Sequence, residues 1–246
     1  MNVFITGGSR GIGRSIVLKF VKEGYGCAFT FAGNEKAAEE TIEQAKRINK
    51  QVKIKKYKMD VKNGDEIDTV VEQAIDDFDT IEVLVNNAGV VRNNAAALMG
   101  NEEWDEVIAT NLSGPFYVIR SFLMHFISNR FGRIISISSL AQNGASGQVN
   151  YAAAKAGLTG LTNTLAREYG AKNITSNIVT VGFVETDMTK DHLAEQLKEI
   201  WMKYCPMKRT TTAEEIAGTV FFLTTEEAGF INGENISVAG GLSYVP

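Results

Sequence analysis

The chain has 246 residues, of which 44% are apolar and 22% are charged, and its formal net charge is −4. This composition is typical of a globular protein and argues against disorder, while the interspersed charges offer no basic surface for nucleic acid. No uninterrupted apolar stretch approaches about 18 residues, and no leader or cleavage site precedes the first predicted strand. We therefore expect a cytoplasmic protein without a membrane span.

Short β-branched runs alternate with amphipathic stretches along the chain. The predicted strands are Asn2–Thr6, Cys27–Phe31, Val52–Lys58, Glu82–Asn86, Arg133–Ser138, Thr175–Val181 and Asn235–Val238. The predicted helices are Gly11–Glu23, Glu35–Asn49, Asp65–Phe78, Glu102–Asn129, Val149–Tyr169 and Ala213–Thr224. This alternation predicts one α/β domain over residues 1–246, a Rossmann-like, doubly wound parallel sheet of about seven strands with helices on both faces.

The cysteines and histidines carry no pattern that indicates a metal. Cys27 and Cys205 match no zinc or redox spacing, so we expect two buried thiols. His125 and His192 have no partner at ligand spacing. We therefore expect no metal site.

The residues after the sixth predicted strand interrupt the alternation. Residues 183–208 contain a helix-like amphipathic pattern that includes Trp201 and Tyr204. Inserts beyond the carboxyl end of a strand often cover a ligand site, so we expect a substrate lid here. The alternative is a helix that contributes to an oligomer contact.

A glycine-rich loop joins the first predicted strand to the first predicted helix. Gly7, Gly11 and Gly13 stand at this junction. Such a loop lets backbone N–H groups approach a phosphate, and the helix N-terminus adds partial positive charge. In an α/β pattern this arrangement favours nucleotide binding, although a tight strand–helix connection would look the same.

The loop and four further motifs resemble those of the short-chain dehydrogenase/reductase family. The motifs are Thr6-Gly-Gly-Ser-Arg-Gly-Ile-Gly13, Asp60-Val61, Asn86-Asn-Ala-Gly89, Asn111 and Tyr151-Ala-Ala-Ala-Lys155. The resemblance implies an oxidoreductase with a nicotinamide cofactor. The cofactor-binding residues it implies are Gly7, Ser9, Arg10, Gly11, Ile12, Gly13, Asn34, Asp60, Val61, Asn87, Ala88, Gly89, Tyr151, Lys155, Val184 and Thr186.

The end of the second predicted strand favours NADP(H) over NAD(H). An NAD site needs an acid there for the ribose 2′-hydroxyl, but the strand ends in Phe31-Ala-Gly-Asn34. Glu35 reads as a residue of the first turn of the next helix. Arg10 in the glycine loop offers a guanidinium for the 2′-phosphate.

Tyr151 and Lys155 stand four residues apart in a helical pattern, so both project from one helix face. A phenol with a pKa of about 10 is a poor acid at neutral pH. A lysine cation about 4 Å away would stabilise the phenolate by about 4 kcal/mol, or roughly three pKa units before desolvation. We therefore expect Lys155 to lower the pKa of Tyr151.

The resemblance implies that Asn111, Ser139, Tyr151 and Lys155 are the catalytic residues. Tyr151 would protonate the carbonyl oxygen, Lys155 would bind the nicotinamide ribose, and Asn111 would hold a water that resupplies protons. A serine hydroxyl would stabilise the developing charge. Neighbouring strand residues face opposite sides, so only one of Ser138 and Ser139 can serve. The common family spacing of 13 residues before Tyr151 would select Ser138, but the alignment of the strand selects Ser139, with a loop shortened by one residue.

Within the family, the chain is most similar to the 3-oxoacyl-[acyl-carrier-protein] reductases. That likeness implies a homotetramer and a substrate on acyl carrier protein, docked by Arg130 and Lys172. The chain departs from the family at Val181, where a proline is usual, and in the small residues Ala95–Ala97. A ketoreductase of a polyketide or aryl-polyene pathway and a reductase of a free small ketone stay open, and a non-enzymatic NADP-binding regulator is disfavoured by the intact catalytic set.

Overall fold

The computed structural model describes residues 1–184 and 192–245, without the side chains of residues 192–197. The strands are β1 (Asn2–Ile5), β2 (Gly26–Phe31), β3 (Ile54–Lys58), β4 (Val83–Asn86), β5 (Gly132–Ser139), β6 (Ile174–Val181) and β7 (Asn235–Val238). They form one parallel sheet in the order β3-β2-β1-β4-β5-β6-β7. The predicted doubly wound sheet of seven strands is thereby confirmed.

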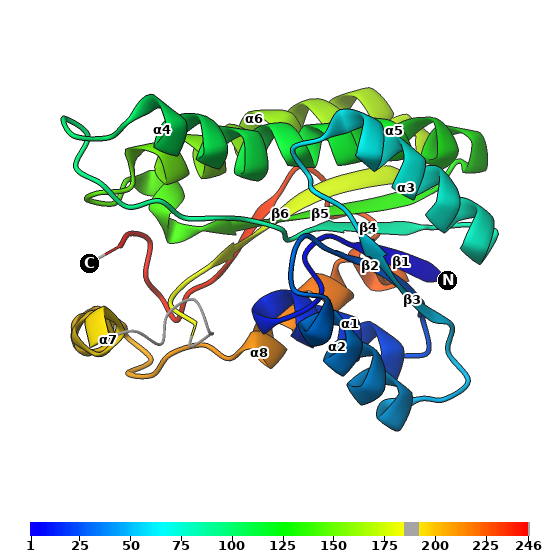
Figure 1. Ribbon diagram of the computed structural model, residues 1–246, viewed down its shortest axis with the longest axis horizontal. Coiled ribbons are helices and arrows are strands. Elements are labelled where there is room, and N and C mark those ends of the chain that lie inside the picture. Colours follow the sequence, from blue (N-terminus) through cyan, green and yellow to red (C-terminus); the bar gives the residue numbers. More distant parts are fainter. Residues whose placement is uncertain (185–191, 246) are drawn as a thin grey trace.

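Helices cover both faces of this sheet (Figure 1). They are α1 (Gly11–Lys22), α2 (Glu35–Ile48), α3 (Gly64–Phe78), α4 (Asn101–Ile108), α5 (Gly114–Asn129), α6 (Val149–Tyr169), α7 (His192–Tyr204) and α8 (Ala213–Phe222). Figure 1 shows α3, α4, α5 and α6 on one face and α1, α2 and α8 on the other. Short 3-10 turns cover Leu140–Asn143, Gly170–Lys172 and Glu226–Ala228.

Strand alternation divides the core into two layers. In β1, Val3 and Ile5 pack into the cluster beneath α1, α2 and α8. Phe4, between them in sequence, points to the opposite cluster and lies against Phe122 of α5, with ring centroids 5.1 Å apart. Both faces of the strand are therefore buried, as expected for a parallel sheet.

One predicted helix is interrupted. The pattern over Glu102–Asn129 forms α4 and α5, joined by a π-helical turn at Ala109–Ser113. Pro115 explains the break, because it has no N–H for the carbonyl of Asn111, its usual i−4 acceptor. Turns of this kind often occur at functional sites, and this one contains Asn111.

Two further expectations can be compared with the structure. Cys27 and Cys205 are both buried and free, as predicted. Among the described residues, none of the helices is long and apolar enough to cross a membrane.

Candidate active site

A cavity of about 440 Å³ opens at the carboxyl edge of the sheet, where the strand order reverses between β1 and β4. Loops diverge at such a point and leave a crevice that suits a nucleotide. The cavity gathers fourteen of the sixteen predicted cofactor residues, namely Gly7, Ser9, Arg10, Gly11, Ile12, Gly13, Asn34, Asp60, Val61, Asn87, Ala88, Gly89, Tyr151 and Lys155. Of the other two, Val184 is buried and pairs with Thr211, and Thr186 lies outside the described residues.

The glycine loop has a shape that larger residues could not adopt. Gly7 and Gly11 have φ values of +68° and +54°, in the left-handed region that favours glycine. A Cβ on Gly13 would lie 2.1 Å from the Gly7 carbonyl oxygen. The chain can therefore fold back on itself before α1 begins, and the folded loop lines the cavity.

Asn87 holds this loop against the end of β4. Its side-chain amide donates to the carbonyl oxygens of Thr6 and Gly7, both at 3.0 Å. The Thr6 hydroxyl in turn accepts from the backbone N–H groups of Asn87 and Ala88 at 3.0 Å. The motif signalled a cofactor contact, but these bonds also make Asn87 a structural part of the loop.

Arg14 is a second support for the loop that the sequence did not reveal. Its guanidinium donates to the Ser9 carbonyl at 2.7 and 3.1 Å and to the Ala37 carbonyl of α2 at 2.9 Å. It also donates to the Thr41 hydroxyl at 3.0 Å, and Thr41 donates to the Ser9 carbonyl. Arg14 therefore ties the loop to α2, whereas Arg10 stays available.

Among the described residues, the segment at the end of β2, residues 31–34, brings no carboxylate to the cavity. Asn34 lines the cavity and caps α2 by accepting from the Ala37 N–H at 2.9 Å. Glu35, in the first turn of α2, points to Lys56 of β3 at 2.8 Å. Arg10 is exposed on the cavity wall and has no ion-pair partner among the residues described. This end therefore presents a free cation where an acid would repel a phosphate.

The third strand supplies the floor of the same wall. Asp60 accepts from the Lys62 N–H at 3.0 Å, which fixes the turn after β3. Its neighbour Val61 packs beneath α5, since a Cβ on Gly114 would lie 2.8 Å from the Val61 carbonyl oxygen. These glycine cradles, the free guanidinium and the cavity size fit a nicotinamide dinucleotide.

Asn111 fixes the loop that follows β4. Its side chain accepts from the Val90 N–H at 3.0 Å and donates to the Val90 carbonyl at 2.8 Å. The π-helical turn carries Asn111 to this position. Gly89 leaves room for the Asn111 side chain because it has no Cβ. Since the side chain is held by Val90, the Asn111 carbonyl, which Pro115 leaves without its usual donor, is available to hold a water.

Tyr151 and Lys155 project from α6 toward the end of β5. The Lys155 ammonium is buried, donates to the Ile137 carbonyl at 2.7 Å and lies 5.6 Å from the centre of the Tyr151 ring. Burial lowers the pKa of Lys155 to about 8. The structure thus places beside the phenol an ammonium group that loses its proton more readily than an exposed lysine does.

The expectation that Lys155 lowers the pKa of Tyr151 is wrong for the protein alone. Burial raises the pKa of Tyr151 to about 12, and only the hydrogen-bonding Ser139 side chain acts in the opposite direction. The expected gain assumed a separation of about 4 Å and no desolvation. In the structure the cost of burying a phenolate is the largest influence on the phenol, and Lys155 is not among the groups that shift its pKa.

Ser138 and Ser139 lie at the end of β5 and make different contacts. Ser139 is the last residue of the strand, and its side chain interacts with the Tyr151 phenol. The Ser138 hydroxyl is buried and donates to the Gln142 side chain at 3.0 Å. Ser138, and not Ser139, is among the residues that line the cavity, so the choice of Ser139 stays a prediction that its contact with Tyr151 supports.

Asn150 positions Tyr151 from the preceding residue. Its buried amide donates to the carbonyls of Arg92 and Glu103, both at 3.1 Å, and its oxygen accepts from the Tyr151 N–H at 2.7 Å. The start of α6 is therefore fixed to α4 and to the loop after β4. No motif spacing signalled this role.

Several predicted residues lie away from the cavity. Arg130 and Lys172 are exposed at the amino ends of β5 and β6. With about 3.3 Å per residue, the eight residues of β5 separate that edge from Ser139 by roughly 23 Å. Ala95–Ala97 are exposed in a turn and do not line the cavity. Smaller side chains there do not widen it.

The predicted lid is described only in part. Residues 185–191 lie outside the described residues, and α7 follows them. Trp201 of α7 packs against Phe183, with ring centroids 5.9 Å apart, and joins the small cluster around Leu140 and Leu242. A second cavity of about 460 Å³ lies between β7, α8 and the segment after α7, and contains none of the predicted catalytic residues.

The fold and the site together define a nucleotide-binding α/β protein with a Tyr–Lys pair at the switch point of its sheet. A family model described as Enoyl-(Acyl carrier protein) reductase matches residues 7–243. The chain belongs to the short-chain dehydrogenase/reductase family. It is therefore an oxidoreductase of that family.

Named relatives agree with this assignment. The chain is 40% identical to 3-oxoacyl-[acyl-carrier-protein] reductase FabG of Staphylococcus epidermidis over 98% of each chain. It is 37% identical to the protein of the same name from Chlamydia pneumoniae, over 98% of this chain and 96% of the relative. Two mutants of a Serratia marcescens short-chain dehydrogenase/reductase match with TM-score 0.89 and 34% identity, over 98% of this chain and 97% of theirs.

Proposed function

We propose that the protein is an NADPH-dependent ketoreductase that reduces a 3-oxoacyl thioester on acyl carrier protein to the 3-hydroxyacyl product, as in fatty acid synthesis. The observation that carries the proposal is the position of Tyr151 and Lys155 on the wall of a cavity suited to a dinucleotide, with the Ser139 side chain in contact with the Tyr151 phenol. The similarity to the FabG reductases over nearly the full chain supports the substrate class.

The residues of the site divide the chemistry between them. Bound NADPH supplies the hydride that adds to the carbonyl carbon. The Tyr151 phenol gives its proton to the carbonyl oxygen, and the Ser139 hydroxyl stabilises the charge that develops there. Lys155 binds the nicotinamide ribose, and its attraction for the phenolate counters part of the burial cost of Tyr151 during the transfer.

Proton resupply follows from the π-helical turn. After the transfer Tyr151 is a buried phenolate, which the free protein disfavours strongly enough to raise the pKa of the phenol to about 12. A water on the Asn111 carbonyl would connect Lys155 to solvent. Lys155, whose pKa is about 8, can pass on a proton and regain it near neutral pH.

Arg10 and Asn34 support the choice of NADPH. The guanidinium of Arg10 is free to bind the 2′-phosphate, and Asn34 replaces the acid that would repel it. Glu35, the nearest acid, is held by Lys56. The cofactor preference therefore rests on one added cation and one missing anion.

The positions of Arg130 and Lys172 constrain how a carrier would dock. Within one chain both lie at the sheet edge opposite Ser139. An acidic carrier bound to them would therefore deliver its acyl group most directly to the site of another copy in the assembly. Charge reversal at both positions should raise the KM for the carrier-bound thioester and leave the KM for the free thioester unchanged.

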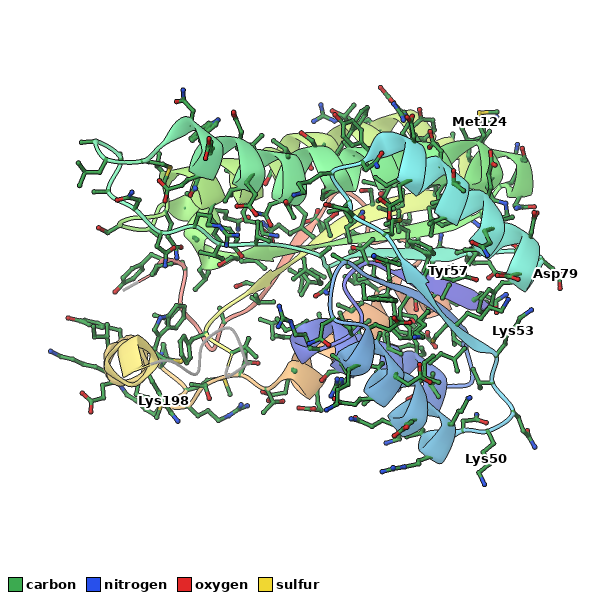
Figure 2. All side chains as sticks on the ribbon, in the orientation of Figure 1. Lys50, Lys53, Tyr57, Asp79, Met124 and Lys198 are labelled. Atoms are coloured by element: carbon green, nitrogen blue, oxygen red, sulfur yellow. The ribbon has the colours of Figure 1, made fainter. Side chains whose placement is uncertain are left out.

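Two separate apolar surfaces support a homotetramer. Trp104, Phe116 and Met124 are exposed on the α4–α5 layer, and Figure 2 shows Met124 on its outer side. Phe222 and Phe230 are exposed beside β7, an edge strand without charged residues. Two distinct two-fold interfaces give a tetramer. Light scattering should give a tetramer mass, and Phe230→Asp and Met124→Asp should each give dimers.

The activity is tested by NADPH consumption with an acetoacetyl thioester, presented free and on acyl carrier protein, with NADH in parallel. The proposal expects faster turnover with the carrier-bound thioester and with NADPH. An enoyl thioester serves as the third substrate, since the family description names that reaction. Reduction of the enoyl thioester alone would overturn the proposal. Reduction of only a bulkier or free ketone would show that the protein is a ketoreductase with a substrate class different from the one proposed.

A further inference from the structure

Four polar side chains are joined by hydrogen bonds beside the end of β5, where Gln142, Thr180 and Asn235 form a closed ring and Ser138 is bonded to Gln142. The Ser138 hydroxyl donates to Gln142 Oε1 at 3.0 Å, and Gln142 Nε2 donates to the Thr180 hydroxyl at 3.0 Å. The Thr180 hydroxyl donates to Asn235 Oδ1 at 2.5 Å, and Asn235 Nδ2 donates to Gln142 Oε1 at 3.3 Å. The members come from β5, the following 3-10 turn, β6 and β7. Gln142 makes three of the four bonds.

The ring fixes the short turn that begins at Ser139. This turn covers Leu140–Asn143, and the Ser139 hydroxyl oxygen accepts from the Ala141 N–H at 3.2 Å. Because one lone pair of Ser139 is taken by Ala141, the direction of its O–H depends on where the turn lies. Gln142 is the side chain of the turn that anchors it to the sheet.

Ser138, which is bonded to this ring through Gln142, also contacts the support of Lys155. Besides its bond to Gln142, the Ser138 hydroxyl reaches the Lys155 carbonyl at 3.4 Å. The Lys155 ammonium bonds to the carbonyl of Ile137, the residue before Ser138. Both Ser139 and Lys155 are therefore attached to the end of β5, which Gln142 holds in place.

We propose that Gln142 is a positioning residue for ketone reduction, which acts by holding the Ser139 hydroxyl in its direction toward Tyr151. The proposal rests on the proposed function, because it assigns a role to Ser139 in the reaction. Gln142 itself touches neither the phenol nor the cofactor cavity. A residue that only stabilised the fold would not act through Ser139.

A double-mutant cycle separates these two roles. Gln142→Ala should lower kcat/KM for the ketone about tenfold, mainly through kcat, and leave the Kd for NADPH unchanged. In a Ser139→Ala background the same substitution should have almost no effect, because the group that it positions is already absent. An equal loss in both backgrounds would overturn the proposal.

Asn143→Ala is the matched control. Asn143 is the next residue of the same turn, is exposed, and donates to the Ser243 carbonyl outside the ring. Its removal should change kcat/KM less than twofold in either background. A loss as large as that of Gln142→Ala would show that any disturbance of the turn suffices, which contradicts a specific role for Gln142.

Gln142→Glu provides a variant that keeps the shape of the side chain. A protonated carboxyl can still donate to Thr180 and accept from Ser138, whereas the carboxylate cannot donate. Activity of this variant should therefore fall relative to the wild type as pH rises through the pKa of the introduced carboxyl. A pH profile with the wild-type shape would contradict the proposal.

Hydrogen exchange tests the positioning without any turnover. The Ala141 amide, which is bonded to Ser139, should exchange faster in Gln142→Ala than in Asn143→Ala. If no ketone is reduced by the wild type while this difference is present, the proposed function fails, but the structural role of Gln142 in holding the turn remains. If ketones are reduced and the difference is absent, only the role of Gln142 fails.

Discussion

The two halves of the sheet build their parts of the site by different means. Around β1 and β4, the cofactor loop is held by hydrogen bonds from the neutral side chains of Asn87 and Thr6 and from the guanidinium of Arg14. Around β5 and α6, the reactive end consists of two ionisable groups, the half-buried Tyr151 and the buried Lys155, each shifted against its charged form. The half around β1 and β4 is therefore preformed, whereas in the half around β5 and α6 the charged forms of Tyr151 and Lys155 are destabilised.

This difference indicates a division of labour. Hydrogen bonds between backbone and neutral side chains change little with pH, so the loop should accept its cofactor over a wide pH range. The charged state of the Tyr–Lys pair depends on pH and on what else occupies the site. We therefore expect binding and chemistry to be separable by substitution, and the following predictions test that separation.

The largest effect is expected for Tyr151→Phe, which removes the proton donor and leaves the cavity shape intact. Ketone-dependent NADPH oxidation should fall about a thousandfold or more. The Kd for NADPH, measured by fluorescence titration, should stay within about twofold. Retained turnover would remove Tyr151 from the reaction, and lost binding would contradict the separation of the two halves.

The next effect concerns pH and the Lys155 ammonium. Because burial lowers the pKa of Lys155 to about 8, raising the pH through 8 removes its charge in the free protein. The value of kcat/KM for NADPH should therefore fall by about tenfold per pH unit above 8. Lys155→Arg keeps its charge, so its residual activity should show no such decline. A flat wild-type profile to pH 9.5 would contradict this role.

A smaller effect is expected for Arg10→Ala, which acts in the preformed half. Loss of a charge-assisted hydrogen bond to the 2′-phosphate should weaken NADPH binding about tenfold or more. Binding of NADH, which has no such phosphate, should be unchanged. Isothermal titration with both cofactors provides the comparison, and equal losses for both would assign Arg10 a role unrelated to the phosphate.

The smallest effect is on the stability of Lys155→Met. Between pH 8 and 10.5 the unfolded chain binds the Lys155 proton and the folded wild type does not, so wild-type stability rises with pH there. The variant lacks this term. It should be more stable than the wild type by about 2 kcal/mol at pH 7, after the lost bond to Ile137 is deducted.

The gap between Lys155→Met and wild type should close as pH approaches 10. Urea unfolding at pH 7, 8.5 and 9.5 measures it. A constant gap would mean that the buried ammonium costs no stability.

The sequence predicted the fold well because the fold depends on local patterns. Seven apolar runs with six amphipathic stretches between them are sufficient for a doubly wound parallel sheet. The sequence did not reveal the break at Ala109–Ser113, because apolar periodicity continues through a π-helical turn. Pro115 was the available signal, since it removes one helical donor.

The site was predictable as a set of residues and less so as a set of interactions. Motif spacing predicted which residues line the cavity, since short motifs fix local geometry. Arg14, Asn150 and Gln142 each also bond to a residue 23 to 93 positions away, which no spacing reveals. The direction of the Tyr151 shift was also missed, because it depends on how deeply α6 and β5 bury the phenol.

The most direct test of the account compares two variants by two measurements, the Kd for NADPH and the single-turnover rate of ketone reduction at saturating NADPH. Tyr151→Phe should lose the rate and keep the Kd, whereas Arg10→Ala should weaken the Kd and keep the rate. That result would show that the preformed half binds and the ionisable half reacts. If either variant lost both quantities together, the two halves would not be separable and the account would be wrong.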